Sequence, residues 1–173
     1  SVRTTEPVVA LLATGLDEPA PSAPVEVSAV SVDQDGGVRL VGLAPVEHTG
    51  GLAGAARVVS VGRGLRARDD LAMVEQLAQA LGAQVGCSMP VADDLGWVPK
   101  DHYVGRSGQQ ISPRLYLALG ISGAPQHLEG IRGAKVVVAV NSDPQAPVFR
   151  RADYGVVGDL YEVVPALIDA LAP

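Results

Sequence analysis

The segment from Leu115 to Asn141 constrains the fold more than any other part of the chain. An apolar run over residues 115–119 is followed by a turn of small residues, 120–124, and then by a predicted helix that begins near Pro125. A second apolar run, 136–140, follows that helix. A strand, a glycine turn, a helix and a second strand form the unit from which parallel α/β sheets are built, and the turn can present backbone N–H groups to a phosphate. The turn alone is weak evidence for a ligand, because many such junctions bind nothing.

The rest of the chain from residue 51 onward repeats the alternation of strand and helix. Loop-rich sequence fills 97–113, and the other predicted elements are strands at 57–62, 84–88 and 154–157, helices at 69–81 and 160–171, and a short helix or turn at 89–96. Hydrophobic residues make up 47% of the chain and aromatic residues only 3%, so aliphatic side chains must form the core. Such a core suits a parallel sheet that helices cover. We therefore expect an α/β fold: a Rossmann-like, doubly wound, mostly parallel sheet with helices on both faces.

Residues 1–50 follow a different pattern from the rest. A short strand is predicted at 8–13 within a segment rich in Pro, Thr and Ala. Two further strands, 25–32 and 38–43, flank the turn-forming residues 33–37 and predict a β-hairpin. The expected organisation is an N-terminal arm and hairpin, 1–50, packed on an α/β domain, 51–173.

Composition excludes several classes of function. The formal net charge of -6 and the lack of a basic cluster argue against a nucleic-acid partner. A single cysteine, Cys87, excludes an internal disulfide and a cysteine-ligated metal cluster. No apolar run is long enough to cross a bilayer and no signal peptide is recognisable, so we expect a cytoplasmic protein without membrane insertion. His48, His102 and His127 have no acidic or thiol partners at the spacing of a metal site or a catalytic triad.

Polar and glycine-rich segments follow nearly every predicted strand. They are the turn 62–64 with Arg63, Ser88, the loop 104–108, the segment 122–127, Asn141 and Asp159. Ligands of doubly wound sheets lie at the carboxyl ends of the strands, so one crevice can hold all of these groups. Each also has an ordinary explanation: a surface arginine, a serine or aspartate that caps a helix, or a histidine on a helix surface.

The string LYLALGISGAPQHLEGIRGAKVVVAVNSD at 115–143, together with the Gly62-Arg63-Gly64 turn, resembles the electron transfer flavoprotein α subunit in its C-terminal FAD-binding domain. The resemblance covers residues 57–171 and implies FAD as the cofactor. It also implies an electron carrier that takes electrons from flavin-dependent dehydrogenases and passes them to a downstream acceptor, with an electron transfer flavoprotein β subunit as its partner. A complete α subunit has a comparably large domain before this one, so we interpret the chain as an excised domain or a short relative. Without the β subunit, exposed apolar surface is expected to make the isolated domain a homo-oligomer.

The resemblance also assigns the residues that contact FAD. Ser107 would approach flavin N5 and His127 the C2 carbonyl, the segment 122–126 would hold phosphate, and Asn141 and Asp159 would hold the adenosine end. The complete set is Arg63, Ser88, Val104, Gly105, Arg106, Ser107, Ser122, Gly123, Ala124, Pro125, Gln126, His127, Asn141, Asp159 and Leu160.

Three residues depart from the family pattern. Met89 stands in place of an arginine near the flavin ring, Arg106 in place of a glutamine, and Pro125 in place of Ile or Val. Pro125 also removes one N–H that could bind phosphate. Either Arg106 restores the charge that Met89 lacks, or it points into solvent. These departures support an alternative function, a divergent non-redox nucleotide-binding or assembly module. A nicotinamide-dependent enzyme is a weaker alternative, because no residue for hydride transfer can be named.

Overall fold

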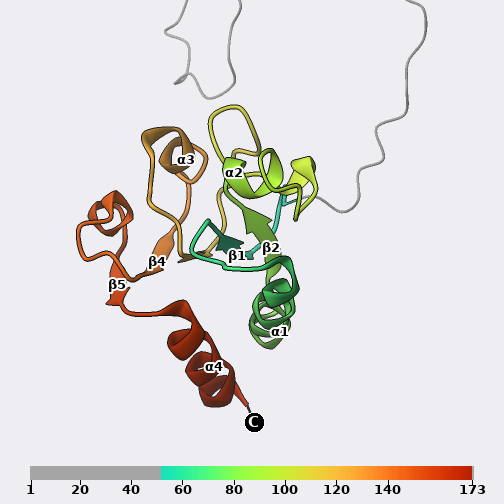
Figure 1. Cartoon of the computed structure of the whole chain (residues 1–173). Helices are drawn as coiled ribbons and strands as arrows, with labels where there is room; N and C mark the ends of the chain where they lie inside the picture. Colours follow the sequence, from blue (N-terminus) through green and yellow to red (C-terminus); the bar gives the residue numbers. More distant parts are fainter. Residues whose placement is uncertain (1–51, 173) are drawn as a thin grey trace, which may run out of the picture. The chain divides into compact units, whose positions relative to one another are not determined.

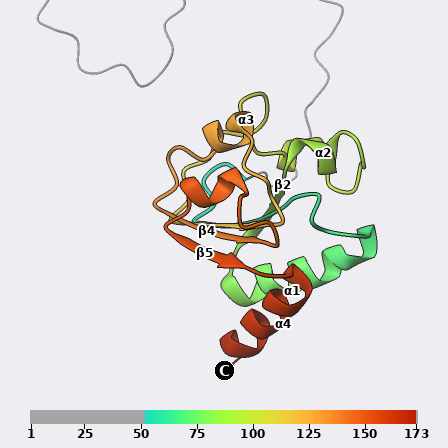
Figure 2. The same cartoon turned by 60° about the vertical axis from the view of Figure 1, so that its left-hand side comes forward.

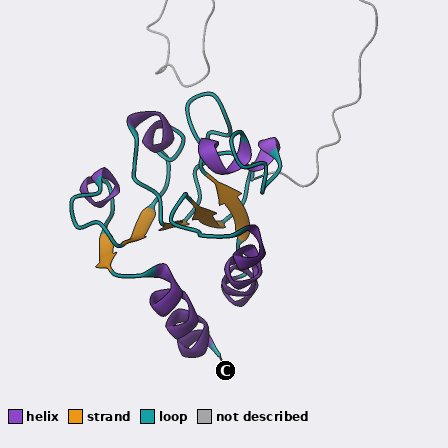
Figure 3. Ribbon diagram, viewed as in Figure 1, coloured by secondary structure: helices purple, strands orange, loops and turns teal. Residues whose placement is uncertain are grey.

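Strands and helices alternate through residues 52–172, the part of the chain that the structure, a computed structural model, describes (Figures 1 and 3). The predicted arm and hairpin at 1–50 lie outside these residues. In chain order the elements are β1 (Arg57–Val61), η1 (Arg68–Asp70), α1 (Leu71–Leu81), β2 (Gln84–Cys87), α2 (Met89–Ala92), η2 (Lys100–His102), β3 (Leu115–Leu119), α3 (Pro125–Glu129), β4 (Val136–Asn141), η3 (Pro147–Arg150), β5 (Tyr154–Val157) and α4 (Leu160–Leu171).

The five strands form one parallel sheet in the order β2-β1-β3-β4-β5. Val59 of β1, for example, pairs with Val85 of β2 on one side and with Leu117 of β3 on the other. The strand order reverses between β1 and β3: β2 lies on one side of β1, and β3, β4 and β5 follow in order on the other side. This is one of the two common orders of doubly wound sheets, and ligands bind where the order reverses, at the carboxyl ends of the strands. The predicted parallel α/β fold is confirmed.

Strands β1, β3 and β4 are mostly buried on both faces of the sheet, whereas the edge strand β5 is exposed along its whole length. Alternate residues along each strand point to opposite faces, so the sheet has a core on each side. Helices α1 and α4 lie side by side against one face, as Figures 1 and 2 both show. The side chains of that core include Val59, Val61, Leu117, Leu119 and Val140 from the strands, with Val74, Leu77 and Val164 from the two helices. The other core joins Val58, Tyr116, Ala118, Val137 and Ala139 to Leu52, Ile131 and Val148. Tyr116 is an unusual member of this core, because it brings a polar hydroxyl into an aliphatic environment.

Helix α1 begins at Leu71, two residues later than the apolar spacing alone predicts. Residues 68–70 form the 3-10 turn η1, and the Asp70 carboxylate accepts a hydrogen bond from the Ala67 N–H at 3.0 Å rather than capping α1 itself. Gly82 ends the helix in the left-handed conformation, with φ of +59°, which glycine adopts without steric cost. The chain then turns directly into β2, so α1 lies antiparallel to the strands that it covers.

Candidate functional site

The turns after β1 and β3 pack backbone against backbone. The Gly62 N–H donates to the Leu119 carbonyl at 2.9 Å, and the Gly64 N–H donates to the Gly120 carbonyl at 3.1 Å. A Cβ atom at Gly62 would lie 2.4 Å from the Gly120 oxygen, so no larger residue fits there. Because its two neighbours are held against the sheet in this way, Arg63 is presented outward at the point where the strand order reverses.

The turn after β3 is also held by the loop before β5. The Val148 N–H donates to the Ser122 carbonyl at 3.0 Å. Gly123 has a φ of +84°, and a Cβ atom there would lie 2.3 Å from the Val148 nitrogen. The short helix α3 follows with Pro125 in its first turn. This packing leaves Ser122 and Ala124 exposed at the carboxyl end of β3.

Two cavities flank this turn and share Arg63 and Ser122 in their walls. The first, which we call the β4-side cavity, has a volume of about 390 Å³ and contains three more predicted residues, Asn141, Asp159 and Leu160. This volume lies within the usual range of small-molecule sites.

The second, the α3-side cavity, has a volume of about 400 Å³. It contains Arg63 and Ser122 together with five further predicted residues: Ser88, Ser107, Ala124, Gln126 and His127. Segments that are up to 96 positions apart in the sequence, from Arg63 to Asp159, therefore converge on one end of the sheet.

Five of the predicted residues line neither cavity: Val104, Gly105, Arg106, Gly123 and Pro125. Val104 is fully buried, and its N–H donates to the Cys87 carbonyl at 2.9 Å. A Cβ atom at Gly105 would lie 2.7 Å from the Tyr103 hydroxyl, so this glycine makes room for a tyrosine that lines the α3-side cavity. Val104 and Gly105 thus support the wall of the α3-side cavity without lining it, while Gly123 and Pro125 line a separate hollow beside α3.

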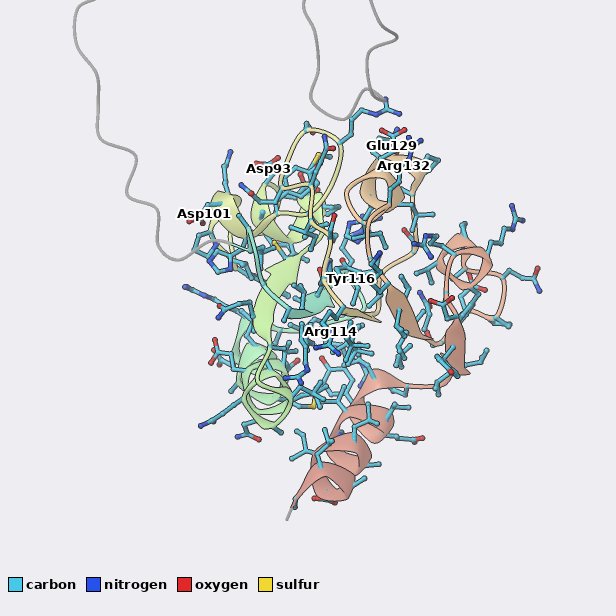
Figure 4. The ribbon with its side chains drawn as sticks, turned by 180° about the vertical axis from the view of Figure 1, so that it is seen from behind. Asp93, Asp101, Arg114, Tyr116, Glu129 and Arg132 are labelled. Carbon is cyan, nitrogen blue, oxygen red and sulfur yellow. The ribbon has the colours of Figure 1, made fainter. Side chains whose placement is uncertain are left out.

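Arg106 forms an ion pair with Glu129 at the end of α3. Its Nη2 atom lies 2.6 Å from Glu129 Oε1, and its Nε atom also donates to the carboxylate. The pKa of Glu129 is lowered, chiefly by the hydrogen bond from Arg106. Figure 4 shows Glu129 beside Arg132 at the outer end of α3, away from Tyr116 in the sheet. The Arg106 charge is thus largely offset by a carboxylate, which neither sequence interpretation of Arg106 included.

His127 is buried, with only 6% of its surface exposed. Its Nε2 atom lies 2.8 Å from the Tyr116 hydroxyl, while its Nδ1 atom is buried and has no hydrogen-bond partner among the described residues. Burial lowers the pKa of His127 to about 4, and the Val104 backbone carbonyl opposes part of that effect, although Nδ1 forms no hydrogen bond in the described residues. A buried polar atom without a partner is costly, which is a reason to expect that a ligand supplies the partner.

Asp159 lies at the N-cap of α4 and within a polar network on the β4-side cavity. Its carboxylate accepts from the Tyr161 N–H at 3.0 Å and from the Arg66 guanidinium at 2.6 Å. The same Tyr161 N–H is the main cause of the lowered pKa of Asp159, with Arg66 adding to it. Arg66 also lies over the Tyr161 ring at 4.3 Å from the centroid. Asp159 is therefore a capping residue and a fixed, ionised acceptor at the cavity wall.

Asn141 joins the loops after β3 and β4. Its Nδ2 atom donates to the Ile121 carbonyl at 2.9 Å, and its Oδ1 atom accepts from the Asp143 N–H at 2.9 Å. An asparagine amide has two N–H donors, so one remains for a ligand in the β4-side cavity. Ser88 also keeps a free polar group: it occupies the N-cap position of α2, but its hydroxyl makes no capping hydrogen bond.

Sequence reasoning missed several residues of the two cavities, chief among them Arg66, Tyr103 and Ser142. Arg66 follows the turn after β1 closely, but one arginine among eleven carries no signal. Tyr103 is one of only four tyrosines, so its rarity in an aliphatic chain was the available clue.

No group of three or more metal-ligating side chains occurs between residues 52 and 172. Within the same range, every helix is too short or too polar to cross a membrane.

The fold and the paired cavities define a doubly wound nucleotide-binding domain, with its site where the strand order reverses. Residues 51–132 match the family described as the electron transfer flavoprotein FAD-binding domain. This part of the chain belongs to that family, whose cofactor is FAD.

Known relatives agree with this assignment. The chain is 56% identical over 121 residues to YdiR of Escherichia coli (strain K12), and 52% identical over 120 residues to the electron transfer flavoprotein subunit alpha of Paracoccus denitrificans. It is 48% identical over 115 residues to the protein FixB of Escherichia coli (strain K12 / DH10B). The matches cover 70%, 69% and 66% of this chain, but only 39%, 39% and 37% of the respective relatives. The chain thus spans about two fifths of the length of these proteins.

The residues present fit FAD. Two cavities that share a guanidinium group suit a dinucleotide with a ring at one end, an adenosine at the other and a pyrophosphate between them. The unpartnered Nδ1 atom of His127 and the remaining N–H of Asn141 are polar groups that such a ligand would satisfy.

Proposed function

We propose that FAD binds across both cavities and that the chain carries electrons as the FAD-binding domain of an electron transfer flavoprotein α subunit or of a related protein. The observation that carries this proposal is the wall of Arg63 and Ser122 that the two cavities share. A mononucleotide would need only one of the cavities, whereas a dinucleotide needs two that are connected at its phosphates.

The roles of the residues follow from their cavities. Ser107 and His127 hold the ring end in the α3-side cavity, and Asn141 and Asp159 hold the adenosine end in the β4-side cavity. Arg63 neutralises the pyrophosphate between them, since guanidinium groups bind phosphate with two parallel hydrogen bonds. FAD, when bound, supplies the redox chemistry, while the protein contributes hydrogen bonds and charge that tune it.

The partners that we propose are an electron transfer flavoprotein β subunit and flavin-dependent dehydrogenases as electron donors, in the cytoplasm. Met89 on the wall of the α3-side cavity is 46% exposed, which leaves apolar surface for a β subunit to cover. A second apolar area lies on the edge strand β5, where Tyr154 is 67% exposed and Val157 is 58% exposed. Exposed apolar edges favour association, so self-association of the isolated domain is expected.

A second candidate is the non-redox nucleotide-binding or assembly module. The observation in its favour is the charge around the ring end: Met89 is neutral and the Arg106 charge is paired with Glu129. Among the described residues that line the α3-side cavity, Arg63 alone carries a full positive charge. Such a module would use the β4-side cavity and have little preference for the flavin part of FAD.

Titration with FAD and with ADP distinguishes the two candidates. If FAD is the ligand, the purified protein should bind it at least tenfold more tightly than ADP, because only FAD fills the α3-side cavity. Flavin absorbance in the purified protein and fluorescence titration of the flavin-free protein measure this. Equal affinities for FAD and ADP would support the non-redox module instead.

Two arginine variants test the role of Arg63 as a matched pair. Arg63→Gln should weaken FAD binding about 10- to 100-fold, the usual effect of losing a hydrogen bond to a charged group. Arg68→Gln changes an exposed arginine that lines neither cavity and should not weaken binding.

The ion pair of Arg106 predicts the redox behaviour of a double variant. Arg106→Gln with Glu129→Gln should leave the potential of bound flavin unchanged, because the pair is removed without a change in net charge. If Arg106 instead replaces the charge missing at Met89, the potential should become more negative in the double variant as well as in Arg106→Gln alone. Spectroelectrochemical titration of the flavin measures both. The pair lies at the surface, where ion pairs contribute little, so the double variant should unfold at nearly the same urea concentration as the wild type.

A further inference from the structure

Tyr116 and His127 form a buried polar pair beside the α3-side cavity. Tyr116 belongs to the central strand β3 and is completely buried, whereas His127 belongs to α3 and forms part of the cavity wall. Their rings lie 6.1 Å apart with an angle of 51° between the planes, and the Tyr116 hydroxyl lies 2.8 Å from His127 Nε2. Tyr116 itself does not line the cavity. Any effect that it has on a ligand must therefore pass through His127.

The pair contains two protons at neutral pH. Burial raises the pKa of Tyr116, so the phenol keeps its proton, and burial lowers the pKa of His127, so the imidazole is neutral and carries one. The Ser60 hydroxyl opposes part of the rise in the pKa of Tyr116, although its oxygen has no hydrogen-bond partner in the described residues. Two arrangements are then available: either the phenol donates to Nε2 and the imidazole proton is on Nδ1, or Nε2–H donates to the phenol and Nδ1 is bare.

The surroundings of the ring distinguish these arrangements. The Val104 carbonyl, which favours the protonated imidazole, is the other polar group that acts on the ring. Because Nε2 already contacts Tyr116, this carbonyl acts on the Nδ1 side. A carbonyl oxygen can only accept a hydrogen bond. A bare Nδ1 atom would therefore place two buried acceptors near each other, while an Nδ1–H group is attracted to the carbonyl.

We propose that Tyr116 is a positioning residue whose hydroxyl donates to Nε2 of His127 and holds the imidazole as the neutral Nδ1–H tautomer. The Nδ1–H group is shielded from solvent and has no acceptor in the described part of the chain, while the ring that carries it forms part of the α3-side cavity wall. Under the proposed function, binding of the flavin brings an acceptor oxygen to this group. His127 then acts on the ring as an uncharged hydrogen-bond donor and not as a cation, and Tyr116 determines which of its nitrogens carries the hydrogen.

Nitrogen-15 NMR of the histidine rings tests this directly in the flavin-free protein. The chain has three histidines, so selective histidine labelling gives few signals. His102 is an internal reference for the Nδ1–H form, because its Nδ1 atom lies 2.6 Å from the Val85 carbonyl and must be the donor. At pH 7 we expect His127 to show the same tautomer as His102 in the wild type, and a mixture of both tautomers in Tyr116→Phe.

Tyr103→Phe is the matched control. It also removes one hydroxyl from a buried tyrosine at the same cavity, but that hydroxyl contacts Ser107 Oγ at 3.1 Å and not His127. The His127 signals should keep the wild-type tautomer in this variant. If Tyr116→Phe fails to fold, the wild-type spectrum alone still decides, because an Nε2–H tautomer in the wild type overturns the proposal. An unchanged single tautomer in folded Tyr116→Phe also overturns it.

The NMR measurement uses no flavin, so its outcome is independent of the FAD titration. If His127 is the Nδ1–H tautomer but the protein binds FAD and ADP with equal affinity, the proposed function is contradicted and the role of Tyr116 still holds. In the FAD-bound protein, Tyr116→Phe should weaken FAD binding several-fold and leave ADP binding unchanged, because ADP does not reach the α3-side cavity.

Discussion

Gly123→Ala should lower the free energy of unfolding by about 3 kcal/mol or more, enough to unfold much of a marginally stable domain. Two costs add. The left-handed conformation of Gly123, with φ of +84°, costs a residue with a Cβ atom about 1–2 kcal/mol. The new methyl group would also lie 2.3 Å from the Val148 nitrogen and 2.5 Å from its Cα atom. Backbone cannot rotate aside as a flexible side chain can, so η3 or the turn must shift, and such overpacking typically costs about 1–3 kcal/mol more.

Gly96→Ala separates the two costs. Gly96 has a similar φ of +61°, but a Cβ atom there meets nothing within 4 Å. Its substitution should cost about 1–2 kcal/mol from the backbone conformation alone. Urea unfolding of both variants, followed by circular dichroism, gives the difference. Equal losses in the two variants would show that the turn after β3 is not packed tightly against η3.

Acid should destabilise the wild type more than a variant that lacks His127. Burial lowers the pKa of His127 to about 4, against an ordinary value of 6.5 in the unfolded chain. Between these two values the unfolded chain binds a proton that the folded protein does not, so lowering the pH favours unfolding. The stability from His127 is complete above pH 6.5 and is lost as the pH falls toward 4, by up to about 3 kcal/mol at about 1.4 kcal/mol for each pH unit.

Urea unfolding of flavin-free wild type and His127→Gln at several pH values measures this loss. The free energy of unfolding of the wild type should fall more steeply between pH 6.5 and pH 4.5 than that of the variant. Above pH 7 the two curves should run parallel, because His127 is unprotonated there in both the folded and the unfolded protein. Parallel curves through the whole acid range would mean that the imidazole is charged or exposed in the folded protein.

The sequence alone determined the secondary structure closely, since apolar periodicity is a local property. The predicted strand at 115–119 and the helix at 160–171 match β3 and α4, and the strands predicted at 57–62 and 84–88 end one residue earlier in the structure. Strand β4 runs one residue longer than predicted, to Asn141. The start of α1 is two residues later than predicted, because residues 68–70 form a 3-10 turn in which the Asp70 carboxylate accepts from the Ala67 N–H. The parallel sheet also followed from the sequence, because strands separated by helices must cross over to pair.

The tertiary structure alone decided what each site residue contacts. Arg106 pairs with Glu129, 23 positions away, and Arg66 pairs with Asp159, 93 positions away. The sequence placed ligand-binding types of residue at the strand ends, but it could not show that five of them line neither cavity, nor that Tyr116 lies against His127. Periodicity along a chain reports which face of an element is buried, whereas partners across the sheet depend on the strand order and on how closely the glycine turns approach one another. That order and approach exist only in the folded molecule.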